Sequence, residues 1–320
     1  MNFLILRKVH PEFLKACEAA NFQATYLPEL SRSEALKIVH KYEVIIGGSL
    51  NLKLDKELLQ KAIKLKVIGR PGSGLDLIDL DYCKLAGIEV LNSPEGNRNA
   101  VAEHLLGMLL MLLNQLHLAN LEVKQFIWER ERNRGFELKG KKVGIIGFGH
   151  NGSLFARKLS GMDVEVLAYD KYKADYASEL SHVREVKLEA IWQEADIISF
   201  HVQHNEETHH YLNSDFIQKF RKPIIVLNAS RGKVIDTKAL IQGIEDAKVS
   251  GACLDVLENE IPNKYSPEEL EMYQKLFNFK QVILSPHVAG WSHWSKVGMS
   301  MILFEKIKDW IVKRNQKTDL

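Results

Sequence analysis

Residues 143–152 read VGIIGFGHNG, an apolar run followed by glycines at positions 147, 149 and 152. A helical pattern over 153–159 comes next, so the glycines stand between a predicted strand and a predicted helix. In a dinucleotide-binding unit Gly147 permits the tight turn, Gly149 lets the backbone approach a pyrophosphate, and Gly152 lets the helix pack on the strand. The N–H groups and partial positive charge at the helix start would bind the phosphates.

An acidic residue stands where such a unit would need one. The next predicted strand ends at Tyr169 and is followed by Asp170, 18 residues after Gly152. A carboxylate here accepts hydrogen bonds from the ribose hydroxyls and repels a 2′-phosphate, which favours NAD over NADP. A glycine-rich turn also occurs in unrelated α/β domains, but strand, helix and acid in register favour the dinucleotide site.

Apolar runs of strand length alternate with helical patterns, which predicts an α/β fold with parallel sheets and crossover helices. The first set of predicted strands is Phe3–Leu6, Ala24–Leu27, Val44–Gly47, Val67–Gly69 and Ile88–Leu91. The second set, of six strands, is Val143–Ile146, Val164–Tyr169, Ile197–Phe200, Ile224–Leu227, Gly251–Leu254 and Val282–Leu284. A long helix over about Ala100–Ala119 lies between the sets, and a C-terminal helix over Trp294–Ile311 is expected to pack on the first domain.

The composition bounds the class of protein. A length of 320 residues suggests about two domains. With 46% hydrophobic and 26% charged residues, the chain can bury a large core, which excludes a disordered protein. The net charge is only +2, from 43 basic and 41 acidic residues, so the chain lacks the excess of positive charge that is typical of proteins that bind a nucleic acid or an anionic membrane. We therefore expect neither partner.

The cysteines and apolar runs point to the cytoplasm. The three cysteines, Cys17, Cys83 and Cys253, have neither disulfide-framework nor metal-site spacing, so a reducing compartment is expected. The apolar run near the N-terminus has only four residues, too short for a signal peptide. The run LLGMLLMLL (105–113) is far shorter than the roughly 20 residues of a membrane span and predicts a buried helix.

Chemically competent residues follow the predicted strands of the second set, and ligands of such sheets bind beyond the carboxyl ends of the strands. Arg231, Glu260 and His287 suit hydride transfer between a 2-hydroxy and a 2-oxo acid. The arginine would bind the carboxylate and polarise the carbonyl, the histidine would transfer the proton, and the glutamate would orient the imidazole. Taken singly, each residue is more often a surface ion pair, a solvated acid or a capping histidine; together they favour the catalytic interpretation.

The chain resembles the D-isomer-specific 2-hydroxyacid dehydrogenase family over nearly its whole length. The motifs are GRPGSGLDLIDL (69–80), NSPEGNRNAVAEH (92–104), GIIGFGHNG (144–152), NASRG (228–232), LDVLENE (254–260) and SPHVAG (285–290). The resemblance implies that Arg231, Glu260 and His287 are catalytic. It also implies that the backbone of Gly72, Ser73 and Gly74 binds the substrate carboxylate. Beside the three glycines, the implied NAD-site residues are His150, Asn151, Asp170, Val202, Ala229, Ser230, Asp255 and Gly290.

The same resemblance implies the architecture. A Rossmann-type NAD-binding domain, 98–289, is expected to be inserted in a flavodoxin-like substrate-binding domain formed by 1–97 and 290–320. The long helix from Ala100 and the segment after it are expected to form a homodimer. The implied partner is a small 2-hydroxy or 2-oxo acid.

Within the family, the chain is most similar to members that act on 3-phospho-D-glycerate at the entry to serine synthesis, in a form expected to lack a C-terminal regulatory domain. Arg70 and Arg130 are the candidate phosphate ligands. The chain departs from these members at Gly47-Gly48-Ser49, where they usually carry Arg-Ser; Lys53 is the possible substitute. Two alternatives stay open: a glyoxylate/hydroxypyruvate or D-lactate type reductase, and an NAD-sensing co-repressor.

Four histidines, His201, His204, His209 and His210, lie within ten residues. Such a cluster can bind a metal ion, but the family uses this loop on its cofactor side without one. No metal is expected.

Overall fold

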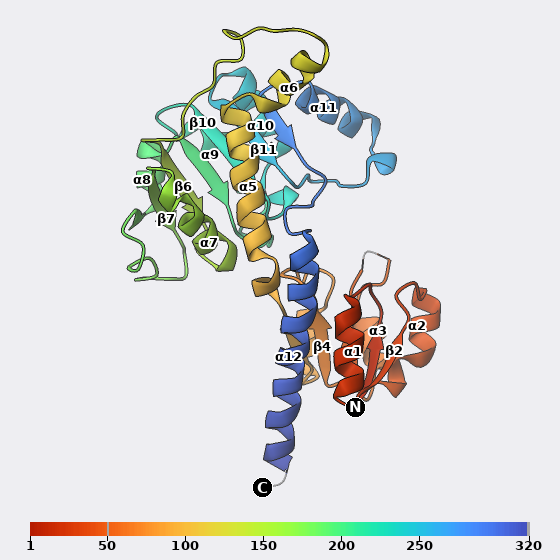
Figure 1. The fold of residues 1–320 in the computed structure, drawn as a ribbon. Helices are drawn as coiled ribbons and strands as arrows, with labels where there is room; N and C mark the ends of the chain where they lie inside the picture. Colours follow the sequence, from red (N-terminus) through yellow and green to blue (C-terminus); the bar gives the residue numbers. More distant parts are fainter. Residues whose placement is uncertain (50, 319–320) are drawn as a thin grey trace. The chain divides into compact units, whose positions relative to one another are not determined.

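The computed structural model describes residues 1–49 and 51–318. It divides into two compact units, one formed by 1–97 with 292–320 and the other by 98–291. Each unit contains one parallel β-sheet with helices on both faces (Figure 1), which confirms the predicted α/β class.

The first unit contains a five-stranded sheet in the order β2-β1-β3-β4-β5, which is the flavodoxin-like order. Its strands are β1 (Asn2–Ile5), β2 (Gln23–Tyr26), β3 (Val44–Ile46), β4 (Val67–Arg70) and β5 (Glu89–Asn92). Its helices are α1 (Pro11–Ala19), α2 (Arg32–Ile38), α3 (Lys56–Lys61), α4 (Leu80–Leu85) and α12 (His293–Thr318), with the 3₁₀ turns η1 (Val39–Lys41) and η2 (Pro94–Gly96).

Alternation of side chains along β1 gives this sheet two apolar faces. Phe3 and Ile5 pack in one core cluster with Phe13 of α1 and Phe304 of α12. Leu4 packs in the other, which includes residues of α2, α3 and α4. The C-terminal helix α12 therefore packs on the first sheet, as predicted, and Figure 1 shows it running beside α1.

The second unit contains a seven-stranded sheet in the order β12-β11-β10-β9-β6-β7-β8. Its strands are β6 (Lys142–Ile146), β7 (Glu165–Tyr169), β8 (Val183–Glu185), β9 (Ile197–Phe200), β10 (Ile224–Asn228), β11 (Val249–Leu254) and β12 (Val282–Leu284). Its helices are α5 (Arg98–Leu113), α6 (Leu116–Lys124), α7 (His150–Lys158), α8 (Leu188–Glu194), α9 (Ser214–Gln218), α10 (Thr237–Glu245) and α11 (Pro267–Phe277), with η3 (Leu159–Gly161), η4 (Gly232–Val234) and η5 (Pro262–Lys264).

Helices α5 and α7 cover one face of the second sheet, and α8 to α11 supply the core of the other. The strand order reverses at β6, which pairs with β7 on one side and with β9 on the other. This reversal creates the switch point at which doubly wound sheets bind ligands.

Two predictions about elements were wrong. The second sheet has seven strands rather than six, because the short strand β8 pairs with β7 at the sheet edge; its sequence, VRE, has no apolar run to reveal it. The helix predicted over Ala100–Ala119 ends at Leu113, since Gln115 takes a left-handed conformation with φ of 52° before α6 begins. The apolar run 105–113 is nevertheless largely buried, as predicted.

Among the residues that the structure describes, no single helix has the length and hydropathy of a membrane span. Helices α5 and α6 reach that threshold only together, and the pair is bent by 64°.

Candidate active site

The glycine turn after β6 is shaped by close backbone approaches. Gly147 has φ of 90°, and a Cβ on it would lie 2.7 Å from the carbonyl oxygen of His201. A Cβ on Gly152 would lie 2.1 Å from the carbonyl oxygen of Gly147. A Cβ on Gly149, by contrast, would meet no atom within 4 Å, so the turn presents open space there. These are the properties expected of a turn that admits a pyrophosphate.

Helix α7 begins at His150, directly after this turn. Its first N–H groups lack intrahelical acceptors and carry partial positive charge, which suits a phosphate. The Oδ1 atom of Asn151 is buried without a hydrogen-bond partner. Val202 lies against the turn, since its Cγ1 would be 3.0 Å from a Cβ on Gly147. The residues present therefore fit a dinucleotide at this edge of the sheet.

Asp170 lies directly after β7 and is bonded to the glycine turn. Its Oδ2 accepts a hydrogen bond from Phe148 N at 2.8 Å, and its Oδ1 accepts one from Tyr172 N at 3.0 Å. Each carboxylate oxygen retains a further lone pair for a hydroxyl donor. The carboxylate therefore lies beside the glycine turn and can still accept hydrogen bonds, which binding of the ribose hydroxyls requires.

The loop after β10 is held by Asn228, a fully buried side chain at the strand end whose positioning role was not predicted from the sequence. Its Oδ1 accepts hydrogen bonds from Ser230 N at 2.9 Å and from Ser230 Oγ at 2.7 Å, and its Nδ2 donates to Arg231 O at 2.9 Å. Asn228 therefore fixes the backbone of Ala229, Ser230 and Arg231.

The next residue, Gly232, packs this loop against the one that follows β11. A Cβ on Gly232 would lie only 1.9 Å from Leu257 O, so no larger residue fits without a backbone shift. The contact joins the Arg231 loop to the loop that carries Glu260. Arg231 itself donates from Nη1 to the carbonyl oxygen of Ser230 at 2.6 Å.

His287 and Glu260 are in direct contact, with 2.8 Å between Nδ1 and Oε2. His287 has a left-handed φ of 56°, and its side chain is 48% exposed, so a small molecule can reach the ring. The hydrogen bond to Glu260 raises the pKa of His287 against the effect of burial; the charges of Glu260 and Asp255 raise it further, while that of Arg231 lowers it. The pair can therefore hold and transfer a proton, and the positive charge of Arg231 acts on it.

Asp255 holds the turn that carries His287. It is almost completely buried, and its backbone oxygen accepts from His287 N at 2.7 Å. Its Oδ1 accepts from Val288 N at 2.9 Å and its Oδ2 from Ala289 N at 2.8 Å, which shapes the turn leading to Gly290. Both carboxylate oxygens are thus engaged within the protein.

Behind Asp255 lies a contact that the sequence did not reveal. His104 of α5 contacts Ser285 Oγ through Nε2 at 2.8 Å, and Ser285 Oγ donates to Asp255 Oδ1 at 2.6 Å. Nothing in the spacing of residues 104, 255 and 285 indicates this chain. The helical position of His104 gave no sign of it either, because apolar residues dominate α5.

In the first unit, the loop after β4 keeps backbone donors available. Gly72 N donates to Ser93 Oγ at 3.1 Å, whereas the N–H groups of Ser73 and Gly74 bond to no acceptor in the described part of the chain. Arg70 donates from Nε to Gly74 O at 3.1 Å and from Nη1 to Gly48 O at 2.6 Å. Arg70 therefore ties two loops together at the carboxyl ends of β3 and β4.

Arg130 lies in the exposed segment between α6 and β6 and forms no hydrogen bond or ion pair with the residues described. No contact links it to His287 or to the glycine turn.

The histidine-rich loop forms contacts of its own. His204 Nε2 lies 3.1 Å from His209 Nδ1, His209 stacks on His210, and His210 Nε2 lies 2.7 Å from Glu258 Oε2. Burial lowers the pKa of His201 to about 3, so its ring is neutral. Within 1–49 and 51–318, no three histidine, cysteine or acidic side chains are placed to hold a metal ion.

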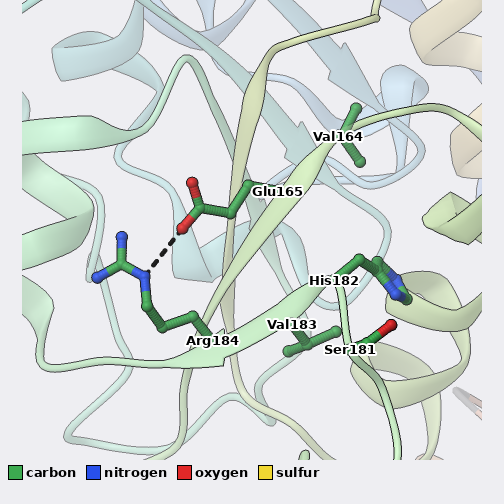
Figure 2. Close-up of a pocket in the computed structure, with 6 residues that line it drawn as sticks. All are labelled: Val164, Glu165, Ser181, His182, Val183 and Arg184. Carbon is green, nitrogen blue, oxygen red and sulfur yellow. Dashed lines mark hydrogen bonds and ion pairs between the residues drawn. The ribbon is translucent and has the colours of Figure 1, made fainter.

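A shallow cavity of about 310 Å³ lies elsewhere in the second unit, at the amino ends of β7 and β8. Figure 2 shows its lining, in which Glu165 and Arg184 pair with each other across 2.9 Å. Because these charges satisfy one another and lie at the sheet edge opposite the glycine turn, the cavity does not belong to the candidate site.

Comparison with known proteins agrees with this geometry. Residues 106–289 match the family described as D-isomer specific 2-hydroxyacid dehydrogenase, NAD binding domain. A D-3-phosphoglycerate dehydrogenase of Archaeoglobus fulgidus is 32% identical over 307 residues, covering 96% of this chain and 56% of the relative. A hydroxypyruvate reductase of Thermotoga maritima is 33% identical over 278 residues, covering 87% of this chain and 88% of the relative.

Among solved structures, D-lactate dehydrogenase from Aquifex aeolicus, complexed with NAD and lactic acid, matches with a TM-score of 0.83. It is 28% identical, and the match covers 99% of this chain and 97% of that one. The chain spans about half the length of the D-3-phosphoglycerate dehydrogenases of Archaeoglobus fulgidus and Synechocystis that it matches.

Proposed function

Because the chain belongs to the D-isomer specific 2-hydroxyacid dehydrogenase family, we propose that it interconverts a D-2-hydroxy acid and its 2-oxo acid with NAD. The observation that carries this proposal is the His287–Glu260 pair, held by Asp255 and accompanied by the positive charge of Arg231. A titratable imidazole with an acidic partner is the group that an alcohol-to-carbonyl conversion needs.

NAD, held by the glycine turn and Asp170, would supply the hydride acceptor for oxidation at C2, and its reduced form, NADH, would supply the hydride donor for reduction. In the oxidation, the C2 hydroxyl proton passes to His287 Nε2, since Nδ1 faces Glu260. Glu260 stabilises the resulting imidazolium, and Arg231 binds the substrate carboxylate and polarises the C2 oxygen. In the reduction, His287 returns the proton to that oxygen. His287 therefore accepts one proton in the oxidation and donates one in the reduction.

For the substrate we favour 3-phospho-D-glycerate. Support comes from the similarity to D-3-phosphoglycerate dehydrogenases, whose name recurs among the relatives. The available N–H groups of Ser73 and Gly74 suit a carboxylate. Hydroxypyruvate, glyoxylate and D-lactate are the competing substrates, because a similar relative or solved structure carries each name.

A substrate panel tests the proposal. The purified chain is assayed in both directions with NAD and NADP, using phosphorylated and unphosphorylated 2-hydroxy and 2-oxo acids. We expect NAD-dependent turnover, and His287→Ala should reduce kcat by roughly 10²- to 10⁴-fold while NAD binding, measured by calorimetry, is retained. No turnover with any acid, together with tight NAD binding, would instead support an NAD-sensing protein.

We also propose that the chain forms a homodimer through α6 and the segment that follows it. The support is a group of exposed apolar side chains in this part of the sequence, here called the α6 face: Leu121, Phe126, Trp128 and Phe136. Exposed apolar patches of this kind mark protein interfaces. The family resemblance implies a second copy of this chain as the occupant.

A further inference from the structure

Arg7 lies at the edge of the first sheet where a ligand is expected. It follows β1 at the carboxyl end of the strand, and Leu6 N still donates to Ile46 O of the neighbouring β3 at 2.8 Å. The strand order β2-β1-β3 reverses at this point, because the chain adds β2 on one side of β1 and β3 on the other. Ligands of doubly wound sheets bind at such switch points.

Arg7 is half-buried, and two of the three nitrogen atoms of its guanidinium are buried without a counter-charge. Its Nε and Nη1 atoms are buried and have no hydrogen-bond partner, and Arg7 forms no ion pair with any residue in 1–49 or 51–318. An arginine stays protonated in proteins, so this charge is real and its burial is costly. The adjacent Lys8 differs, since it is 74% exposed and paired with Glu29 at 3.0 Å.

The neighbouring loops leave the charge of Arg7 unneutralised. The residues after β3, Gly47 and Gly48, carry no side chain that could pair with it. The other arginine at this edge, Arg70, already donates to the carbonyl oxygens of Gly48 and Gly74. Unlike Arg70, Arg7 therefore retains the capacity to bind an external anion.

We propose that Arg7 binds a second anionic group, a carboxylate or a phosphate, of the substrate. The inference rests on the proposed function, in which Ser73 and Gly74 donate to the first carboxylate. Adjacent strands lie about 4.8 Å apart, so the ends of β1 and β4, with β3 between them, are separated by about 10 Å. Arg7 and the loop after β4 therefore lie at the same edge of the sheet, and the preferred substrates are 2-hydroxy acids that carry a second anionic group.

The test compares Arg7→Gln and Arg7→Lys with the matched control Lys8→Gln, which removes a charge one residue away. Activity is measured with 3-phosphoglycerate, with 2-hydroxyglutarate, and with the singly charged glycerate and lactate. We expect kcat/KM of Arg7→Gln to fall by about 10- to 100-fold for those substrates with two anionic groups that the wild type uses. The singly charged acids should change by less than about twofold, and Arg7→Lys should retain part of the rate.

Comparison of 3-phosphoglycerate with 2-hydroxyglutarate shows whether the second group is a phosphate or a carboxylate. An equal loss for singly and doubly charged acids would overturn the inference, because Arg7 would then act on structure or on the first carboxylate.

A second measurement does not depend on turnover. Inorganic phosphate should raise the Tm of the wild type and of Lys8→Gln, but not that of Arg7→Gln. Without added anion, Arg7→Gln should be at least as stable as the wild type, because it removes an unpaired buried charge. A wild type that phosphate does not stabilise, or an Arg7→Gln variant stabilised to the same extent, would overturn the inference even if the dehydrogenase activity is found. Phosphate stabilisation that requires Arg7 would support it even if the substrate panel shows no turnover.

Discussion

The side chain of His287 is positioned by two acidic residues of another loop, the buried Asp255 and the exposed Glu260. Asp255 accepts hydrogen bonds from three successive backbone N–H groups, those of His287, Val288 and Ala289. Glu260 then fixes the orientation of the ring through Nδ1. These contacts set both the direction of the free Nε2 atom and the range of pH over which it carries a proton.

Substituting Glu260→Gln tests the proton-holding role of the pair. The hydrogen bond to Glu260 raises the pKa of His287, so its loss lowers that pKa. Reduction of a 2-oxo acid needs the imidazolium, and its rate should therefore be lost at lower pH in the variant. Oxidation needs the neutral ring, so the pH at which the rate of oxidation rises should also be lower in the variant.

The measurement is kcat/KM against pH in both directions. Glu258→Gln is the matched control, because Glu258 lies in the same loop but contacts His210 and Thr237 N instead. Profiles of Glu260→Gln that coincide with those of the wild type would remove Glu260 from the mechanism.

Asp170 is expected to select NAD against NADP through its charge. Asp170→Asn keeps the size of the side chain but removes the repulsion of a 2′-phosphate. The ratio of kcat/KM for NAD to that for NADP should fall by about tenfold or more. Asp175→Asn, a change at an exposed acid of the same loop, should leave the ratio unaltered. An unaltered ratio in Asp170→Asn would show that other residues bind the ribose.

The strand–turn–helix unit of β6 and α7 depends on close packing between its two elements. A Cβ at Gly152 would lie 2.1 Å from Gly147 O, a backbone atom that cannot swing aside as a side chain does. The position of the start of α7, and with it the predicted phosphate site, therefore depends on Gly152 having no Cβ atom.

Gly152→Ala should displace α7 from β6. We expect a loss of about 1–3 kcal/mol in the free energy of unfolding, measured by chemical denaturation, together with weaker NAD binding by calorimetry. Gly161→Ala is the control, because a Cβ there meets no atom within 4 Å. Unchanged stability and NAD affinity in Gly152→Ala would contradict the packing argument.

In the described part of the chain, several exposed apolar side chains lie in α6 and the segment that follows it. Phe126 is 99% exposed and Trp128 78% exposed, and both lie in the α6 face. Exposure of such side chains to water is unfavourable, and a homodimer interface would bury them.

The assembly is tested by sedimentation velocity. We expect a dimer for the wild type and a shift toward the monomer for Phe126→Asp combined with Leu121→Asp. Leu85→Asp, at a leucine on α4 of the first unit that is even more exposed than Leu121, should leave the dimer intact. A monomeric wild type at micromolar concentration would refute the homodimer.

The local features of this protein were predictable from its sequence, since spacing alone encodes them. Gly147 and Gly149 lie between β6 and α7, and Asp170 follows the next strand, as predicted. Helix α7 begins at His150, earlier than predicted, so Gly152 lies in its first turn. Strand β8 and the break after Leu113 were not predictable, because pairing with β7 and the conformation of Gln115 override weak local patterns.

The contacts that position the candidate site were decided only by the tertiary structure. His104, Asp255 and Ser285 come from distant parts of the chain, and no periodicity relates them. Arg7 looked like an ordinary basic residue beside Lys8, and only its burial without a partner distinguishes it. Sequence spacing records which residues are near one another along the chain. Burial and pairing depend on which distant segments the fold brings together.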